Sequence, residues 1–315
     1  MFSVRVYQIC SKLNKDQEEM SIESQSSVKV ERFKFRHITY VILALKVLIV
    51  AWLIWQFFQS KQQNSFVFDS EFYLFVLAGF LAQLIDGALG MAYGVSCTTF
   101  LLHLGVPPVV ASASVHTAEV FTTGVSGLSH LYLKNVDKKL FLRLAIPGIV
   151  GAMIGAFLLS KILDGNAIKP FVAGYLLILG ILIVIKSIRE PLFKDEIKNV
   201  SPLGFFGGML DAMGGGGWGP IVTSNIIQRG KTPKLTIGTV NTAEFFVAFF
   251  STGVFLFFVG MEGWKTILGL ILGGVLAAPI GAYLVRFIKP RILMFLVGIV
   301  IIVTSIYNIL SSYPR

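Results

Sequence analysis

The sequence predicts an all-α polytopic membrane protein with two inverted repeats, each a broken, re-entrant Gly-rich hairpin plus three transmembrane helices, and one extra N-terminal transmembrane helix. The 315-residue chain is 55% apolar and 14% charged, with a mean hydropathy of +0.76. One soluble core could not hide that much apolar surface, so lipid must surround most of the chain. The segment V-H-T-A-E-V-F at 115–121 recurs as V-N-T-A-E-F-F at 240–246, and the same displacement relates Asp86 to Asp211. Such a duplication, with interrupted helices and acids in apolar sequence, is typical of secondary transporters.

The N-terminal part precedes the duplicated sequence. Residues 1–36 are polar and basic and predict a cytoplasmic tail, and 37–59 predict the extra transmembrane helix. The net charge of +10 does not indicate nucleic acid as a partner. The basic residues lie in this tail and in short loops, where they orient membrane spans.

The duplicated part divides into repeat 1 at 72–188 and repeat 2 at 201–311. A span needs roughly 20 apolar residues. The apolar stretches lie at 72–104, 109–131, 140–162, 168–188, 202–228, 234–259, 264–288 and 291–311. Two of them are interrupted, by D-G-A-L-G-M-A-Y-G at 86–94 and by D-A-M-G-G-G-G-W-G-P at 211–220. Irregular backbone at membrane depth is tolerated only inside protein or beside a cavity.

Loop charge predicts how the interrupted stretches lie. If each is a re-entrant hairpin, all the loops rich in Lys and Arg are cytoplasmic, namely 132–143, 186–200, 229–234 and 286–291. If each crosses the membrane once, the loop 132–143 falls outside, against the positive-inside rule. The hairpin topology has seven full crossings and a cytoplasmic N-terminus. Each repeat then has an odd number of crossings, so the repeats are inverted.

Four acids in membrane-grade sequence are candidate coupling residues. Glu119 and Glu244 lie within apolar helices, where a carboxyl group often marks an ion pathway. The alternative is a protonated glutamate that only locks helix packing. Asp86 and Asp211 each precede a Gly-rich break. They would hold the break open or coordinate a coupling cation, or else cap a helix end.

His116 and Asn241 stand three positions before the two glutamates, on the same helix face. Histidine can carry a proton near neutral pH, but asparagine cannot. Because the repeats differ here, we expect both side chains to hydrogen-bond the substrate rather than both to relay protons. The alternative is a buried histidine satisfied by a backbone carbonyl group.

The Gly-rich breaks indicate an anion site. A half-helix that begins inside the membrane presents free amides and the positive end of its dipole, and glycine lets a ligand approach the backbone. Tyr93 and Trp218 correspond across the repeats and would either wall the site or anchor at the membrane interface. No His, Cys and acid spacing predicts a metal site. The expected substrate-binding residues are Gly87, Gly90, Gly94, His116, Thr117, Gly214, Gly215, Gly216, Asn241 and Thr242.

At these residues the chain resembles the TauE/SafE sulfite exporter family. The resemblance is carried by G-F-L-A-Q-L-I-D-G-A-L-G-M-A-Y-G-V at 79–95, A-S-A-S-V-H-T-A-E-V-F-T-T at 111–123, G-G-M-L-D-A-M-G-G-G-G-W-G-P at 207–220 and V-N-T-A-E at 240–244. It covers about 72–311 and excludes the tail and the first helix. The resemblance implies a polytopic protein with duplicated halves that moves small anions, particularly sulfur oxyanions or organosulfonates, out of cells.

Together these observations predict a secondary active exporter of a small anion in a plasma membrane, with protons as coupling ions and no cofactor. A cation transporter that uses the four acids as ligands remains an alternative, as does a passive anion channel. A membrane-embedded enzyme with His116 and Glu119 as an acid–base pair is a further alternative. No nucleophile or cofactor motif accompanies that pair, so we do not expect an enzyme.

Overall fold

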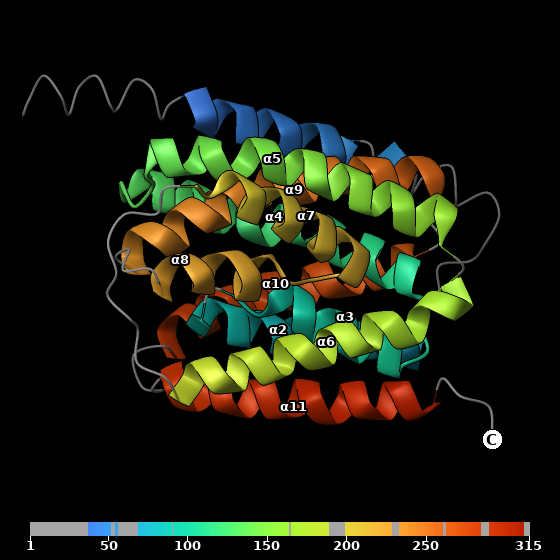
Figure 1. Ribbon diagram of the computed structural model, residues 1–315. Coiled ribbons are helices and arrows are strands. Elements are labelled where there is room, and N and C mark those ends of the chain that lie inside the picture. Colours follow the sequence, from blue (N-terminus) through green and yellow to red (C-terminus); the bar gives the residue numbers. More distant parts are fainter. Residues whose placement is uncertain are drawn as a thin grey trace, which may run out of the picture. The chain divides into compact units, whose positions relative to one another are not determined.

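All regular secondary structure in the described part of the chain is helical (Figure 1). The computed structural model describes residues 37–51, 54–55, 69–89, 91–163, 165–188, 199–228, 233–260, 263–284 and 290–311. Four helices are long and apolar enough to cross a membrane: Lys138–Ile162, Ala167–Ile188, Leu235–Phe258 and Met294–Ser311. These findings confirm the predicted all-α polytopic membrane protein.

The N-terminal part is described by itself, because the chain divides into a unit of residues 1–47 and a unit of residues 48–315. An apolar helix occupies His37–Ala51. It lies within the predicted first transmembrane segment at 37–59. The predicted tail at 1–36 lies outside the described residues.

The first half of the duplicated part comprises α2 to α6. The elements are α2 (Ser70–Leu89), α3 (Tyr93–His103), α4 (Pro108–Tyr132), α5 (Lys138–Phe157), the π-helix η1 (Leu158–Ile162) and α6 (Gly165–Ile188). The break between α2 and α3 is shorter than the predicted 86–94. The helix continues through Asp86 because its side chain reaches forward to backbone amides beyond the helix end, rather than ending the helix itself.

The second half comprises α7 to α11. The elements are α7 (Ser201–Gly214), the π-helix η2 (Gly219–Thr223), α8 (Ser224–Gln228), α9 (Pro233–Phe258), α10 (Trp264–Leu284) and α11 (Pro290–Ser311). The break after α7 requires glycine. Gly215, Gly216 and Gly217 have φ angles of 69°, 150° and 147°, which residues with a Cβ rarely adopt.

Helices of the two halves pack against each other in matching pairs. α2 packs on α10 and α5 packs on α7, while α4 packs on α9 and α6 lies beside α11 (Figure 1). Glycine makes the first two contacts close. A Cβ on Gly151 of α5 would lie 2.0 Å from the Phe205 carbonyl oxygen, and one on Gly273 of α10 would lie 2.0 Å from that of Val76. Small residues at these positions let the backbones of neighbouring helices approach closely.

Contacts along these pairs fix the relative directions of the helices. Each pair shares at least two contacts whose order along both chains gives the direction. The contacts are Gly148–Gly208 and Gly155–Met209 for α5 and α7, and Phe75–Gly269 and Phe80–Gly273 for α2 and α10. For α4 and α10 they are Thr122–Gly274 and Val110–Gly263, where Gly263 directly precedes α10. They are Phe141–Phe246 and Phe157–Phe258 for α5 and α9, and His116–Phe255 and Gly127–Thr242 for α4 and α9. Thus α2, α4 and α10 run one way, and α5, α7 and α9 run the opposite way.

Candidate functional site

The candidate site lies where the centres of α4 and α9 meet the two Gly-rich breaks. α4 is rich in Ser and Thr and is buried along most of its length, so its polar face turns inward rather than toward lipid. This arrangement places His116 and Glu119 inside the protein, only 0% and 2% exposed. On α9, Asn241 is also buried, while Glu244 is partly exposed.

Asp86 and Asp211 stabilise the two breaks in the same way. The Oδ1 atom of Asp86 accepts hydrogen bonds from the amides of Ala92 and Tyr93, at 2.9 and 3.2 Å. The Oδ1 atom of Asp211 accepts one from the Trp218 amide, at 2.9 Å. Each aspartate therefore ties the end of one helix to the start of the next, across the same sequence distance. The capping interpretation of these two residues is confirmed.

The two Gly-rich breaks touch each other. A Cβ on Gly216 would lie 2.3 Å from the carbonyl carbon of Gly94, and a Cβ on Gly94 would lie 2.7 Å from Oε1 of Glu119. The amide of Gly216 donates to the carbonyl oxygen of Asp211 at 3.0 Å, so it is not free for a ligand in this conformation. Glycine therefore serves here, at least, to let the two breaks meet beside a glutamate.

The remaining glycine predictions have different outcomes. The carbonyl group of Gly215 accepts a hydrogen bond from the Thr98 hydroxyl. Gly214 lies against the ring of Tyr175, where a Cβ would come within 2.1 Å of a ring carbon. Gly87 lies in the last turn of α2, and Gly90 lies outside the described residues.

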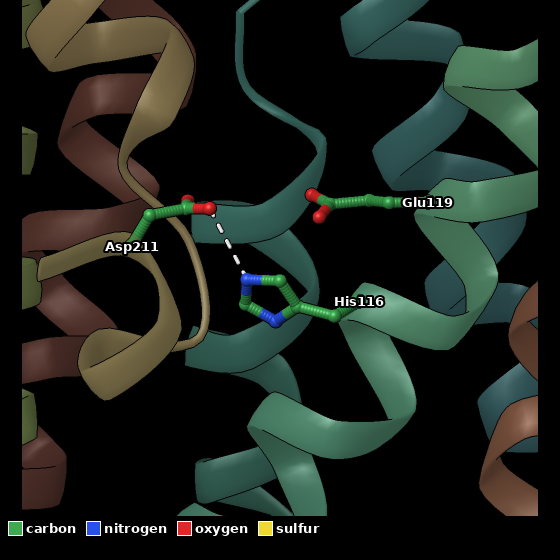
Figure 2. A group of neighbouring side chains, drawn as sticks. All are labelled: His116, Glu119 and Asp211. Atoms are coloured by element: carbon green, nitrogen blue, oxygen red, sulfur yellow. Dashed lines mark hydrogen bonds and ion pairs between the residues drawn. The ribbon is translucent and has the colours of Figure 1, made fainter. Parts of the chain in front are cut away.

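His116 links the two halves. Its Nε2 atom lies 3.1 Å from Oδ2 of Asp211 on α7 (Figure 2). Its Nδ1 atom lies 2.8 Å from the carbonyl oxygen of Ser112. The ring packs at a tilt against Phe255, with 5.8 Å between the ring centroids. Thus the histidine is satisfied by a backbone carbonyl group, as the alternative interpretation expected, and also by an aspartate of the other half.

Glu119 completes a buried group of three ionisable side chains. Figure 2 shows its carboxyl group beside the His116–Asp211 contact, and the donor atoms of the three residues lie within 4.8 Å of one another. Its Oε2 atom is buried and has no hydrogen-bond partner in the described part of the chain. Two carboxyl groups without a buried lysine or arginine among the described residues need a positive charge. Whatever cation neutralises them, a proton or a metal ion, would lie among these side chains.

The corresponding place in the second half is built differently. Asn241 donates through Nδ2 to the Ser126 hydroxyl, at 3.0 Å. The Thr117 and Thr242 hydroxyls donate to carbonyl oxygens of their own helices, those of Ala113 and Gly238, each at 2.7 Å. Because their protons are used, these hydroxyls do not donate to a ligand in this conformation.

Tyr93 and Trp218 occupy matching places under the breaks. They are 4% and 0% exposed, so the interpretation that they anchor at a membrane interface is wrong. The Trp218 indole N–H donates to the Val240 carbonyl oxygen at 3.2 Å, and its ring lies against Gly148. The Tyr93 hydroxyl donates to the Leu270 carbonyl oxygen at 3.4 Å. Both aromatic rings therefore support the breaks from within the protein.

Sequence reasoning found all three members of the buried group but not the pairing of His116 with Asp211. The duplication relates His116 to Asn241 and Asp211 to Asp86. It does not say which aspartate faces which helix, because that depends on how the halves pack.

Comparison with known proteins identifies the lineage of this fold and site. Residues 75–308 match the family described as "Sulfite exporter TauE/SafE". The chain is 43% identical over 250 residues to "Probable membrane transporter protein YtnM" of Bacillus subtilis (strain 168), covering 76% of this chain and 83% of that protein. It is 28% identical over 242 residues to "Probable membrane transporter protein ORF9" of Sinorhizobium sp, covering 73% and 90%. No solved structure matches the chain.

Proposed function

The chain belongs to the sulfite exporter TauE/SafE family and is a membrane transporter, and from this premise we propose that it is a secondary active exporter of a small anion such as sulfite or an organosulfonate. It resides in the plasma membrane with its N-terminus in the cytoplasm, and protons are its coupling ions. The observation that carries this proposal is the meeting of the two Gly-rich breaks at Gly94 and Gly216, beside the buried Glu119.

The helix directions support two inverted repeats. α2 and α4 run the same way, so α3 must return the chain between them, as a re-entrant hairpin does. The segment formed by η2 and α8 must do the same between α7 and α9. The second half then repeats the first with every direction reversed. Two inverted halves around a central site provide the symmetry that alternating access requires.

The chemistry of the site supports coupled movement of an anion and a proton. An anion that enters between the breaks lies beside Glu119, whose negative form would repel it. Protonation of the buried carboxyl groups removes this repulsion, so anion occupancy and protonation favour each other. A proton and a monovalent anion that move together are exported when the outward gradient of the anion exceeds the inward gradient of protons, and are taken up when it does not. The amide-rich breaks would contact the anion after the halves separate, because in the described conformation Gly94 and Gly216 leave no space between them.

Flux into proteoliposomes tests the proposal. Purified protein is reconstituted and offered sulfite, sulfate, thiosulfate, sulfoacetate or a monovalent cation, each with and without an imposed pH gradient. We expect saturable uptake of one or more of the sulfur anions that increases with the gradient. Flux of the cation alone would favour the cation transporter, and non-saturable anion flux indifferent to the gradient would favour a channel. The monovalent cation is included because the four acids, above all the unpartnered Oε2 atom of Glu119, could also bind a cation.

A further inference from the structure

The hydrogen bonds of His116 fix how many protons it holds. A carbonyl oxygen can only accept, so the Nδ1 atom, 2.8 Å from the Ser112 carbonyl oxygen, must carry a hydrogen. The Ser112 hydroxyl donates to the Ala212 carbonyl oxygen at 2.6 Å, so its proton is used elsewhere. A neutral imidazole has only one N–H group. If His116 were neutral, its Nε2 atom would present a bare lone pair.

That lone pair would face a second acceptor. Oδ2 of Asp211 lies 3.1 Å from Nε2, and both side chains are buried. Two acceptors at hydrogen-bond distance without a hydrogen between them repel, and burial makes the repulsion costly. The contact therefore requires one proton more than a neutral histidine and a carboxylate supply. It resides on Nε2, as an imidazolium–carboxylate pair, or on Oδ2, as an imidazole–carboxylic acid pair.

We propose that the His116–Asp211 pair holds the coupling proton of the transport cycle, at the contact between the two halves. This inference rests on the proposed function and deepens it by assigning the proton to one pair rather than to the two glutamates equally. Because His116 belongs to α4 and Asp211 to α7, movement of the halves against each other opens or closes the contact. Opening the contact removes the partner that holds the proton and releases it.

The duplicated sequence provides one such pair in the described chain and not two. The residue related to His116 is Asn241, which bonds the Ser126 hydroxyl. The residue related to Asp211 is Asp86, whose described bonds go to the Ala92 and Tyr93 amides. An asparagine cannot take up a proton at neutral pH. Of the two related places in the transporter, the one with His116 and Asp211 therefore holds a proton, whereas Asn241 and Asp86 make only hydrogen bonds.

The other groups that face the pair keep the proton in the centre. Glu119 on α4, Glu244 on α9 and Asp86 on α2 all act on this centre electrostatically, and Tyr175 on α6 acts on Asp211. α3 contributes Tyr93 and Cys97, which face Glu119. None of the described lysines or arginines is buried, so the proton is the positive charge among these acids. Glu119 can accept the released proton, since its carboxyl group belongs to the same buried group and its Oε2 atom is unpartnered in the described part of the chain. In that step the bond from Nε2 or Oδ2 to hydrogen breaks and an Oε2–H bond forms.

Asp211→Asn isolates the proton from the geometry. The Asn Oδ1 atom still accepts from the Trp218 amide, and the Asn amide group donates to a neutral Nε2 atom, so both contacts survive without the extra proton. Asp86→Asn is the matched control for the effect of Asp211→Asn on the His116 ring. It makes the same change at the related position, where the described bonds go to backbone amides.

The first measurement detects the proton of the His116–Asp211 pair directly, by nitrogen NMR. Protein labelled with ¹⁵N-histidine is reconstituted in bilayers, and the His116 signals among the four histidines are assigned by their loss in His116→Asn. At pH 7 we expect the wild-type signals of an imidazolium, or of an Nε2 atom that shares a proton. Asp211→Asn should show a neutral ring with a bare Nε2 atom, and Asp86→Asn should match the wild type. A bare Nε2 atom in the wild type overturns the proposal if the Asp211 carboxyl group is also ionised, as ¹³C-aspartate spectra of the same sample show, because neither partner then holds the proton. So does a stoichiometric metal ion in elemental analysis of the purified protein.

The second measurement tests whether the pair couples anion transport to the pH gradient. Asp211→Asn should lose at least ten-fold in anion accumulation driven by a pH gradient while retaining anion exchange between equal pH values. Asp69→Asn, an Asp to Asn change at the exposed start of α2, controls for the substitution itself. Gradient-driven accumulation by Asp211→Asn at the wild-type level overturns the proposal. If the wild type moves no anion at all, the proposed function fails and the coupling role falls with it, while the nitrogen spectra still decide whether the pair holds the proton.

Discussion

The two halves of the molecule agree in what holds their breaks together and differ in what can carry charge. In both, an aspartate accepts the amide of an aromatic residue seven positions later, Tyr93 after Asp86 and Trp218 after Asp211. In the first half, however, the residue before Thr-Ala-Glu is a histidine, which reaches the aspartate of the second half. The related asparagine makes a local bond to a serine. A duplicated scaffold can thus keep its backbone geometry while its chemistry becomes one-sided.

The largest expected effect concerns the topology of the two halves, because their relation fails altogether if they are not inverted in the membrane. In a cysteine-free background, single cysteines at 106 and 262 should label fully with a membrane-impermeant reagent from outside. A cysteine at 231 should label only from the cytoplasmic side. The reason is that inverted halves place their equivalent loops on opposite faces of the membrane. Labelling of 106 and 231 from the same side would contradict the inverted arrangement.

The next largest effect is expected at the glycines of the second break. Gly215 has φ of 69°, and a Cβ there would lie 2.5 Å from Oγ1 of Thr98. Gly215→Val should therefore reduce the yield of folded protein severely, because backbone strain of about 1–3 kcal/mol adds to a buried clash.

Gly105→Val is the matched control. Gly105 also has a positive φ, of 85°, but nothing lies within 4 Å of its added Cβ. Gly105→Val should therefore lose only as much yield of folded protein as the backbone strain alone costs. Monodispersity in fluorescence-detected size exclusion measures both variants. Equal yields for the two substitutions would show that the contact of Gly215 with Thr98 does not limit folding.

Coupling should distinguish the glutamates of the two halves. Glu119→Gln and Glu244→Gln keep size and hydrogen bonding but remove titration. We expect both to fold and to lose gradient-driven flux, with the larger loss, at least ten-fold, for Glu119→Gln. Glu119 lies beside His116 and Asp211 and is almost fully buried, whereas Glu244 is partly exposed. Flux against external pH measures this, with anion exchange as the control for folding. Wild-type pH dependence in both variants would make the two acids structural.

The scaffold could be predicted from the sequence, but the pairing at its centre could not. Apolar length placed α4 to α11 within a few residues, because a span of fixed thickness demands a fixed number of apolar residues. Duplication identified Asp86, Asp211, Glu119 and Glu244. The contact of His116 with Asp211 depends on how two halves pack, and no local pattern encodes that. The sequence left the place of Trp218 open between the site and the membrane interface for the same reason, since an indole in apolar sequence suits either place, and the structure buries it.

The smallest expected effect concerns the ends of the two halves. α2 begins with Asp69, whose carboxylate accepts the Phe72 amide at 3.0 Å and pairs with Lys265 at 2.7 Å. The helix that begins the second half, α7, starts after Val200 with no side-chain cap. The hydrogen bond from Lys265, followed by that from the Phe72 amide, lowers the pKa of Asp69 below its usual value. A lowered pKa means that the folded protein binds the proton less well than the unfolded chain does.

The stability contributed by Asp69 is therefore complete above the pKa of an unfolded aspartate, about 3.9, and is lost as the pH falls through the lower folded value. Asp69→Asn should reduce the Tm by a small amount at pH 7, because exposed ion pairs contribute little. The difference from the wild type should close as the pH approaches 3. Thermal unfolding in detergent at several pH values measures this, with Lys265→Met as the companion variant that removes the other partner. A difference that is constant with pH would show that Asp69 acts through helix capping without its charge. The start of α2 would then differ from the start of α7 in hydrogen bonding alone.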